Sequence, residues 1–297
     1  MMAHHELSDA TITSISGTVA GLMATFAKQP IQRVKWIRQT SPVEQPYSVI
    51  FRETLQRYGW RGFFGGSLAA ICRNVPHSVI VYSLYPHCAQ LAREETFGTR
   101  FAAGYVTLIL STMATHPLDT LRVRLSVHPD TMINSATRIY KTDGIRGFYS
   151  GFAATLIGAG PRGAIGFAIF ETGKPIAHDL LPDQPAFAKF LCGYLAGLVA
   201  ESLVYPLDTV RRRQQALGPS HPIGRLSALV AIVRIAQAEG VSGLFKGIAL
   251  NLVKNPAGTA VSFAVNDIVK EALGYEGGQH QPPSRTTTTT TKPSFFG

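Results

Sequence analysis

The chain has 297 residues, 45% of them hydrophobic, and a formal net charge of +10. The positive charge forms no basic stripe on a polar helix, which argues against nucleic acid as a partner. The three cysteines, Cys72, Cys88 and Cys192, are too few and too scattered for a disulfide framework or a metal site, so we expect free thiols and neither a metal nor a cofactor.

The two ends of the chain differ from the rest in composition. Residues 1–9 lack the Arg-rich, acid-poor character of a cleaved transit peptide, so any targeting signal is expected to be internal. Residues 276–297 include a run of six threonines and are predicted to form a disordered, low-complexity tail.

Charge-free runs predict membrane-spanning helices. Residues 10–27 and 101–118 contain no Asp, Glu, Lys or Arg, and each run is close to the length at which a helix crosses about 30 Å of hydrocarbon. Other apolar stretches are interrupted by single charges. A charge inside a spanning helix usually faces a water-filled interior and marks function. These single charges are Arg73, Arg162, Glu201 and Lys254.

Three copies of one unit follow each other along the chain. The first signature of each unit is KQPIQRVKWIRQ at Pro30, THPLDTLRVRLS at Pro117 and VYPLDTVRRRQQ at Pro206. The second signature is YGWRGFFGG, DGIRGFYSG and EGVSGLFKG in the same order, followed each time by an apolar segment with a proline near its start. Self-similarity of this kind defines repeats. We place them at 10–98, 99–184 and 185–275.

Each unit is predicted to hold a spanning helix with an internal proline, a short surface helix such as 47–58, a glycine turn and a second spanning helix. Three units give an all-α membrane protein with six spans and both termini on one side. The segments 28–66, 116–151 and 205–247 hold 18 basic and 7 acidic residues. Because basic residues gather on the side that is not translocated, we expect all three segments on one face of the membrane.

The triplicated pattern Pro-x-Asp/Glu-x-x-Lys/Arg, closed by Gly-x-x-x-x-aromatic-x-Gly, resembles the mitochondrial carrier signature over about residues 10–273. The resemblance implies a three-fold pseudosymmetric bundle with a central cavity. It also implies a monomer in the inner mitochondrial membrane with both termini in the intermembrane space, although some similar relatives reside in peroxisomes. The expected partners are a small anionic substrate and the lipid bilayer, with cardiolipin as a candidate lipid.

The resemblance implies a matrix gate at the ends of the odd-numbered spans. Acids of one repeat are expected to meet bases of the next, Asp119 with Arg211 and Asp208 with Lys35. Gln32 stands where the third acid is expected, so a hydrogen bond to Arg122 is the most that this pair can form. The bracing position holds Gln39, Gln215 and Ser126.

A second, cytoplasmic gate is expected on the even-numbered spans. Glu171 and Lys174 match it on the fourth span, and Asp267 and Lys270 match it on the sixth. The second span carries neither charge, so only Glu171 with Lys270 is expected to pair between repeats. Because an isolated exposed pair contributes about 0–1 kcal/mol, we predict that this gate is the weaker one and that the resting state opens toward the intermembrane space.

The resemblance places substrate contacts midway along the even-numbered spans, at Arg73, at Gly158 with Ala159, and at Lys254. A small residue between two cations suits an anion with a flat moiety. This arrangement is similar to that of the adenine nucleotide and coenzyme A carriers, and segments such as LNLVKNPAGTAVSF look most like the coenzyme A branch.

Three further residues are expected in the same cavity. Arg162 stands where those branches usually place a tyrosine, and it would bind another phosphate, stack on a base or select a different anion. Glu201 would neutralise Arg162, bind a cationic group or carry a proton. His77 lies four residues after Arg73 and is either a packed histidine or a relay.

The sequence therefore predicts an antiporter that exchanges coenzyme A or an adenine nucleotide such as ADP by alternating access. A carrier of a small carboxylate or other anion, and a channel or proton-leak protein, remain as alternatives. An enzyme is not expected, because the sequence has no paired catalytic carboxylates, no Ser/His/Asp spacing and no phosphate-binding loop after a strand.

Overall fold

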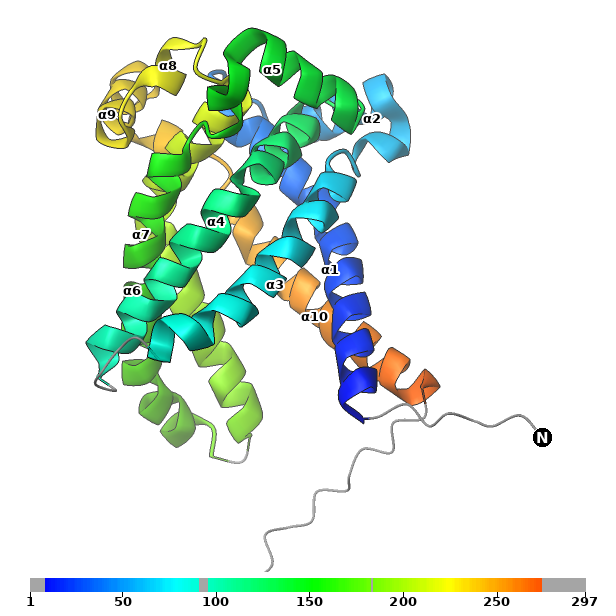
Figure 1. The fold of residues 1–297 in the computed structure, drawn as a ribbon, viewed down its shortest axis with the longest axis vertical. Coiled ribbons are helices and arrows are strands. Elements are labelled where there is room, and N and C mark those ends of the chain that lie inside the picture. Colours follow the sequence, from blue (N-terminus) through cyan, green and yellow to red (C-terminus); the bar gives the residue numbers. More distant parts are fainter. Residues whose placement is uncertain (1–8, 91–95, 183, 274–297) are drawn as a thin grey trace, which may run out of the picture.

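The structure is a computed structural model that describes residues 9–90, 96–182 and 184–273 (Figure 1). The predicted tail and residues 1–8 of the predicted N-terminal segment lie outside the described residues. The helices are α1 (Asp9–Thr40), α2 (Tyr47–Gly62), α3 (Ser67–Gln90), α4 (Phe97–Val127), α5 (Met132–Phe148), α6 (Phe152–Leu180), α7 (Pro185–Leu217), α8 (Pro222–Arg225), α9 (Ala228–Glu239), the 3₁₀-helix η1 (Val241–Phe245) and α10 (Ala249–Ala272). Cys72, Cys88 and Cys192 are free thiols, as predicted.

Six long helices of the described chain, α1, α3, α4, α6, α7 and α10, form the bundle, and the predicted all-α fold with three repeats is confirmed. The most extensive helix pairs join different repeats, α3 with α4, α6 with α7 and α10 with α1, so the ring closes between the first and last repeats. The first long helix of each repeat, α1, α4 or α7, also contacts the other two.

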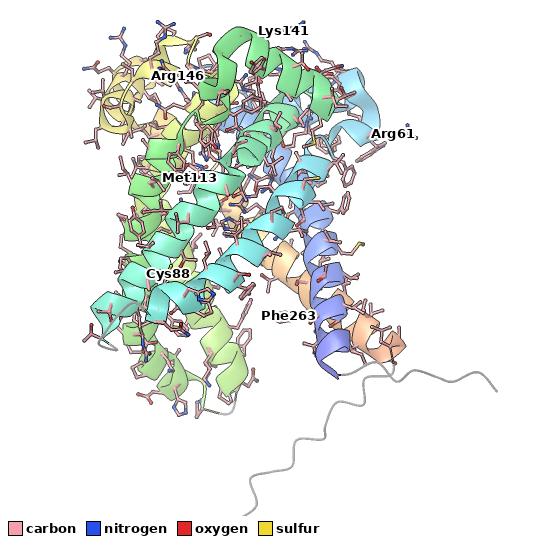
Figure 2. All side chains as sticks on the ribbon, viewed as in Figure 1. Arg61, Cys88, Met113, Lys141, Arg146 and Phe263 are labelled. Atoms are coloured by element: carbon pink, nitrogen blue, oxygen red, sulfur yellow. The ribbon has the colours of Figure 1, made fainter. Side chains whose placement is uncertain are left out.

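The two ends of the bundle differ. The short helices α2, α5, α8 and α9 lie at one end, here called the surface-helix end, whereas α1 begins and α10 ends at the other, the terminal end (Figure 1). Figure 2 shows Arg61, Lys141 and Arg146 at the surface-helix end, where all three side chains are exposed. The basic segments therefore share one end of the molecule.

Apolar length alone identifies only part of this bundle as spanning. Among the described residues, α6 and the segment Phe187–Leu217 are long and apolar enough to cross a membrane. The helical segments Ala228–Glu239 and Val241–Ala272, which are bent by 120° relative to each other, would form a third candidate if they were one span. The charge-free runs singled out from the sequence lie instead in α1 and α4. Hydroxyl side chains make these runs less apolar, and several of them bond within their own helix. Thr25 Oγ1 donates to Gly21 O and Thr107 Oγ1 donates to Ala103 O, both at 2.8 Å.

Within each repeat, the short helices lead into the second long helix through a glycine with positive φ. Gly66, Gly151 and Gly247 have φ values of 82°, 74° and 85°. A Cβ at Gly66 would lie 2.8 Å from Arg122 O, and one at Gly151 would lie 2.8 Å from Arg211 O. Glycine is required here both by backbone conformation and by the close approach of the neighbouring helix. In the third repeat, a Cβ at Gly247 would lie 3.2 Å from the carbonyl oxygen of Lys35.

Changing Gly151 to alanine is expected to destabilise the protein by about 1–3 kcal/mol, because an L-residue is strained at positive φ and its Cβ would press on Arg211 O. The midpoint of thermal unfolding, Tm, of the purified protein measures this. Gly197→Ala is the matched control, since a Cβ there meets no atom within 4 Å and alanine favours a helix. Equal Tm values for the two variants would contradict the proposed contact.

A second repeated contact fixes α1, α4 and α7 to the glycine turns. The residue before each signature proline reaches the carbonyl oxygen just before the turn glycine. Gln29 Nε2 donates to Gly65 O at 2.6 Å and Tyr205 OH donates to Lys246 O at 2.9 Å. In the second repeat, His116 Nε2 lies 3.0 Å from Ser150 O. Three different residue types make one contact, so sequence comparison of the repeats did not find it.

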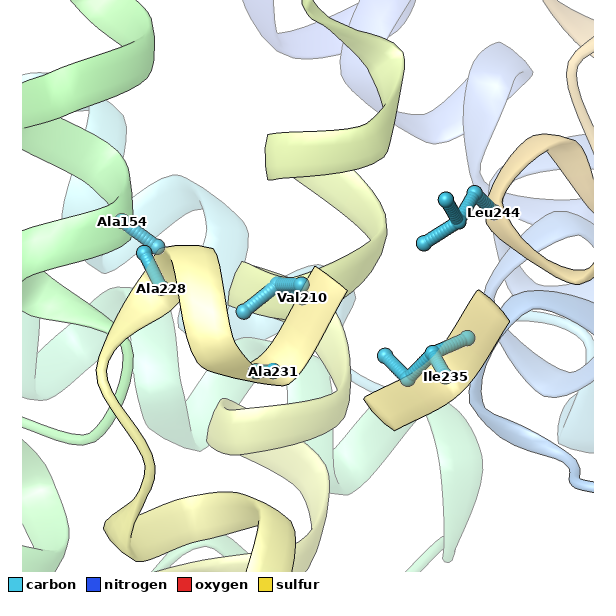
Figure 3. Close-up of a cluster of buried hydrophobic side chains, with 6 residues drawn as sticks. All are labelled: Ala154, Val210, Ala228, Ala231, Ile235 and Leu244. Atoms are coloured by element: carbon cyan, nitrogen blue, oxygen red, sulfur yellow. The ribbon is translucent and has the colours of Figure 1, made fainter. Parts of the chain in front are cut away.

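The surface helix α9 is held by a small apolar cluster (Figure 3). Ala228, Ala231 and Ile235 form its buried face and pack against Val210 of α7 and Ala154 of α6. Their spacing of three and four residues is the helical period of an amphipathic helix. The cluster couples the surface helix α9 to α6 and α7, both of which carry predicted site residues.

An ion cluster fixes the end of α9 to α7. Glu239 pairs with the Arg213 guanidinium, whose Nη2 donates at 2.8 Å, and with Lys246 Nζ at 2.7 Å. Burial opposes ionisation of Glu239, but the hydrogen bonds from Arg213 and Lys246 outweigh it and hold the pKa of this carboxyl below its usual value of 4.5. Glu239 is therefore ionised at neutral pH.

Because the folded pKa of Glu239 is depressed, its stabilising contribution is present above the unfolded pKa and lost as the pH falls through the folded pKa. We expect Tm to fall more steeply between about pH 6 and pH 3 in the wild type than in Glu239→Gln, which should have the lower Tm at neutral pH. Parallel pH profiles for the two proteins would show that Glu239 is not the group responsible.

Candidate functional site

Helices α1, α4 and α7 meet around a charged cluster at the surface-helix end of the bundle. Asp119, on α4 just after Pro117, is 4% exposed and accepts from Arg211 Nη2 of α7 at 2.5 Å. Gln215 Nε2, one turn further along α7, donates to the same Oδ2 at 2.9 Å. The structure thus brings together Asp119, Arg211 and the bracing Gln215 as predicted from the repeat.

The second predicted pair lies beside the first. Asp208 of α7 is 6% exposed, and its Oδ2 lies 3.8 Å from Lys35 Nζ of α1. Gln39 Nε2 donates to Asp208 at 3.4 Å and to Thr209 Oγ1 at 3.1 Å. This pair is longer than that of Asp119, so its electrostatic attraction is weaker.

Arg212 joins the two acids and was not predicted as a member of this cluster. Its Nη1 lies 3.4 Å from Asp119 Oδ2 and its Nε lies 3.7 Å from Asp208 Oδ1. The guanidinium also donates to Gln215 Oε1 at 3.0 Å. The sequence signal was the triple arginine in the third signature, whose middle residue has no basic counterpart in the other two repeats.

The hydrogen bond that Gln32 and Arg122 could form is not made in the described chain. Instead, Arg122 lies over the ring of Trp36 at 5.2 Å from its centroid, and Arg212 lies over the same ring at 4.7 Å. Trp36 is 2% exposed. Where the first repeat lacks an acid, an aromatic ring between two guanidinium groups takes its place through cation–π attraction.

A cavity of about 290 Å³ lies next to the charged cluster. Predicted substrate residues Arg73 of α3 and Gly158, Ala159 and Arg162 of α6 all line it. The cavity reaches the cluster itself, because Asp208 and Arg211 also line it. Arg162 Nη2 lies 3.9 Å from Asp208 Oδ1, so the extra arginine is part of both the cavity and the charged cluster.

Glycine at position 158 also serves packing. A Cβ there would lie 3.2 Å from Val204 Cγ1 and 3.6 Å from Leu207 Cβ, both on α7. The absence of a side chain therefore lets α6 approach α7 closely, in addition to leaving the cavity wall flat.

The structure bears on one of the three alternatives for Glu201. Among the described residues, Glu201 does not pair with Arg162. Its Oε1 lies 3.7 Å from Lys35 Nζ and its Oε2 accepts from Asn255 Nδ2 at 3.3 Å. Prediction placed Glu201 by its distance from Pro206 along α7, which fixes its level in the bundle but not which neighbouring helix it faces.

The remaining predicted substrate residues lie beside the 290 Å³ cavity rather than in its wall. Lys254 of α10 lies within electrostatic range of Lys35, Glu201 and Asp208. His77 Nδ1 lies 3.3 Å from Thr115 Oγ1, which links α3 to α4. Lys254 belongs to the same charged region, whereas His77 makes a packing contact between helices.

A larger cavity, of about 620 Å³, adjoins the first and shares three wall residues with it, Leu108, Ala159 and Gly163. Its wall contains four aromatic rings and one cation, Arg100. The rings are those of Tyr85, Phe101, Tyr105 and Phe167. A cationic space and an aromatic space thus lie side by side, with the small residues of α6 at their boundary.

The predicted cytoplasmic-gate residues lie at the terminal end. Glu171 and Lys174 are exposed and line a shallow cavity of about 470 Å³ on α6 and α7. In the part of the chain that the structure describes, Glu171 forms no ion pair with Lys270, and Asp267 is exposed. The pairs of the surface-helix end are formed and the expected pair of the terminal end is not.

Basic side chains outnumber acidic ones around the cavity and the charged cluster. The basic side chains are Lys35, Arg73, Arg122, Arg162, Arg211, Arg212 and Lys254, and the acidic ones are Asp119, Glu201 and Asp208. Walls of low dielectric screen these charges weakly, so the region attracts anions.

Comparison with known proteins identifies the family. A family profile described as mitochondrial carrier protein matches residues 8–96, 93–180 and 182–277. The mitochondrial coenzyme A transporter of Homo sapiens is 32% identical over 280 residues, which cover 88% of this chain and 87% of the relative. Its namesake in Xenopus tropicalis is 31% identical over 284 residues, covering 87% and 84%. The thylakoid ADP,ATP carrier protein of Arabidopsis thaliana is 30% identical over 273 residues, covering 87% of this chain and 65% of the relative.

The three matched segments follow the helices, with α1 to α3 in the first, α4 to α6 in the second and α7 to α10 in the third. The similarity to coenzyme A and adenine nucleotide carriers that the motifs indicated is confirmed by the named relatives. The chain therefore belongs to the mitochondrial carrier family, a family of multi-pass membrane transporters rather than enzymes.

Proposed function

We propose that this transporter exchanges a nucleotide-type anion, coenzyme A or an adenine nucleotide such as ADP, across the inner mitochondrial membrane by alternating access. One observation carries the proposal: Arg73, Arg162 and Arg211 line a single cavity next to the flat surface of Gly158 and Ala159. Guanidinium groups bind phosphate through paired hydrogen bonds, which suits a ligand with two or more phosphate groups.

The adjoining aromatic cavity supports a base-containing ligand over inorganic phosphate. An adenine ring in contact with Ala159 would reach the space lined by Tyr105 and Phe167, while its phosphates remain near the arginines. Stacking on aromatic rings stabilises a bound base by about 1–3 kcal/mol. A nucleotide thus uses both spaces, whereas a small anion uses only one.

Substrate binding is proposed to loosen the charged cluster. A phosphate near Arg162 and Arg211 competes with Asp208 and Asp119 for the same guanidinium groups. Binding energy gained in the cavity then offsets the cost of breaking the ion pairs at the surface-helix end. Exchange without net flux follows, because the empty carrier lacks that compensation.

We further propose that the surface-helix end faces the matrix and the termini face the intermembrane space. The exposed basic residues of that end, such as those labelled in Figure 2, support this orientation through the positive-inside rule. In this orientation the ion pairs of the surface-helix end would close the matrix gate.

Uptake into proteoliposomes tests the substrate. Vesicles preloaded with ADP or coenzyme A should take up the labelled nucleotide in a saturable manner, and empty vesicles should not. A dicarboxylate serves as the competing substrate, because Arg162 in place of a tyrosine also suits a carboxylate. Dicarboxylate uptake as fast as nucleotide uptake would remove the proposal, and uptake by empty vesicles would favour a channel or leak protein.

A further inference from the structure

A separate pocket of about 340 Å³ lies at the surface-helix end, outside the exchange cavity. The end of α1 and the helix α2 form one side of it, and the ends of α4 and α7 with His128 form the other. All three repeats therefore contribute to one pocket. Its apolar wall includes Ile37, Ile50, Val127 and Leu217.

A buried arginine with no hydrogen-bond partner lines this pocket. Arg33 is 1% exposed, and its Nε and Nη1 atoms are buried and donate to no acceptor in the described chain. The guanidinium lies 5.3 Å from the centroid of the Tyr58 ring, which compensates only part of the charge. A buried cation without an acceptor is costly, and a bound anion would remove that cost.

The other repeats show that arginine is not needed here for folding. Thr120 and Thr209 occupy the equivalent position, three residues after the signature proline. Thr120 Oγ1 donates to Phe148 O at 2.8 Å and Thr209 Oγ1 donates to Leu244 O at 2.6 Å. The first repeat has replaced this structural hydrogen bond with a positive charge.

No carboxylate of the described chain neutralises Arg33. Glu53 lines the same pocket but is exposed and forms no ion pair with Arg33, and Arg57 adds a second exposed cation at the rim. The pocket therefore combines a buried guanidinium, a net positive charge and an apolar wall. That combination matches an organic anion with one charged group.

We propose that the Arg33 pocket binds a small organic anion, with a phosphate or carboxylate group held by Arg33 and an apolar body against Ile37, Ile50 and Val127. This site is distinct from the exchange cavity. Because the ends of α1, α4 and α7 must separate for the surface-helix end to open, an anion that contacts all three holds this end closed. That effect on transport depends on the proposed alternating access, but binding itself does not.

Phenyl phosphate is the probe, and benzyl alcohol is its uncharged counterpart. Thermal unfolding of the full chain in detergent should show a saturable rise in Tm with phenyl phosphate and none with benzyl alcohol, because a ligand of the folded state stabilises it. Arg33→Thr should retain the fold, since the threonine can donate to Phe63 O as its counterparts do in the other repeats. It should weaken binding about tenfold or more.

Two variants locate the bound anion. Arg73→Ala alters the exchange cavity and Arg61→Gln alters an exposed cation of α2, and both should bind phenyl phosphate as the wild type does. Loss of binding in Arg73→Ala with retention in Arg33→Thr would place the anion in the exchange cavity and overturn the proposal. The proposal would also be overturned if Arg33→Thr bound phenyl phosphate with wild-type affinity, or if phenyl phosphate did not raise the Tm of the wild type. If Arg33→Thr does not fold, Arg33→Lys should still bind more weakly.

A second arm distinguishes the source of the anion. Phosphatidic acid in the detergent micelles replaces phenyl phosphate, with the same variants. Arg33-dependent stabilisation by phenyl phosphate alone identifies a soluble ligand, and stronger Arg33-dependent stabilisation by phosphatidic acid than by phenyl phosphate identifies a lipid. In proteoliposomes, a ligand of this site should lower the maximal rate of nucleotide exchange without changing the apparent affinity for the nucleotide, and competition with the nucleotide would contradict the separate site.

Discussion

Replacement of Arg73 with alanine is expected to lower nucleotide exchange by about 100-fold or more. Arg73 lines the same cavity as Gly158 and Arg162, and its guanidinium can form paired hydrogen bonds to a phosphate there. Charge-assisted bonds contribute about 1.5–3 kcal/mol each, and every 1.4 kcal/mol of lost stabilisation lowers a rate about tenfold. Lys254→Ala should have a smaller effect, of about tenfold, because Lys254 acts on the cavity through its charge rather than from the cavity wall.

Initial rates of exchange in proteoliposomes measure both effects, with Tm as the check that each variant is folded. Arg61→Ala is the control for a lost positive charge, since Arg61 is exposed on α2 and far from the cavity wall. If Lys254→Ala lowers the rate more than Arg73→Ala does, the substrate lies nearer α10 than the cavity between α3 and α6. Rates equal to the wild type in both variants would refute the assigned cavity.

Repetition is the reason that the sequence predicts so much of this protein. A pair such as Asp119 and Arg122 at one position of a single helix is uninformative, but the same spacing in the third repeat requires both helix ends to face a common axis. The contact between Asp119 and Arg211 follows from that symmetry and from no other property of the sequence. The charged cluster was therefore predictable wherever the three repeats agree.

Positions at which the repeats differ could not be found in this way. Trp36 and Arg212 each stand one residue after a gate base, where the second repeat has Val123. Their contact across the axis compensates for the acid that Gln32 does not supply. Arg33 is a similar case, because its role becomes visible only when the hydrogen bonds of Thr120 and its counterpart are known.

Rotation of a helix about its own axis also limits prediction. Spacing from a proline gives the depth of a residue in the bundle at 1.5 Å per residue, but each step turns the side chain by about 100°. Glu201 was placed at the correct depth in α7, but its partners, Lys35 and Asn255, come from α1 and α10. Only the packing of neighbouring helices settles such choices.

Replacement of Asp119 with asparagine is expected to be the most destabilising single change in the charged cluster, at about 3–5 kcal/mol. Asp119 is 4% exposed and accepts from Arg211, Arg212 and Gln215 through one oxygen atom. The variant removes the charge partner of Arg211 and leaves Arg212 with Asp208 alone. Asp208→Asn should cost less, because the contacts of Asp208 with Lys35 and Arg212 are at 3.8 and 3.7 Å.

Thermal or denaturant unfolding in detergent gives the order of stability. Glu44→Gln is the control, because the Arg38–Glu44 pair is at 2.7 Å but Glu44 is 60% exposed, and exposed pairs contribute about 0–1 kcal/mol. A loss for Asp119→Asn no larger than that for Glu44→Gln would mean that the cluster does not hold the surface-helix end closed. Since the cluster must break during every transport cycle, a carrier needs these pairs to be strong when empty and weak when substrate competes for the same arginines. Asp119→Asn should therefore lower stability in the empty protein more than in protein saturated with nucleotide.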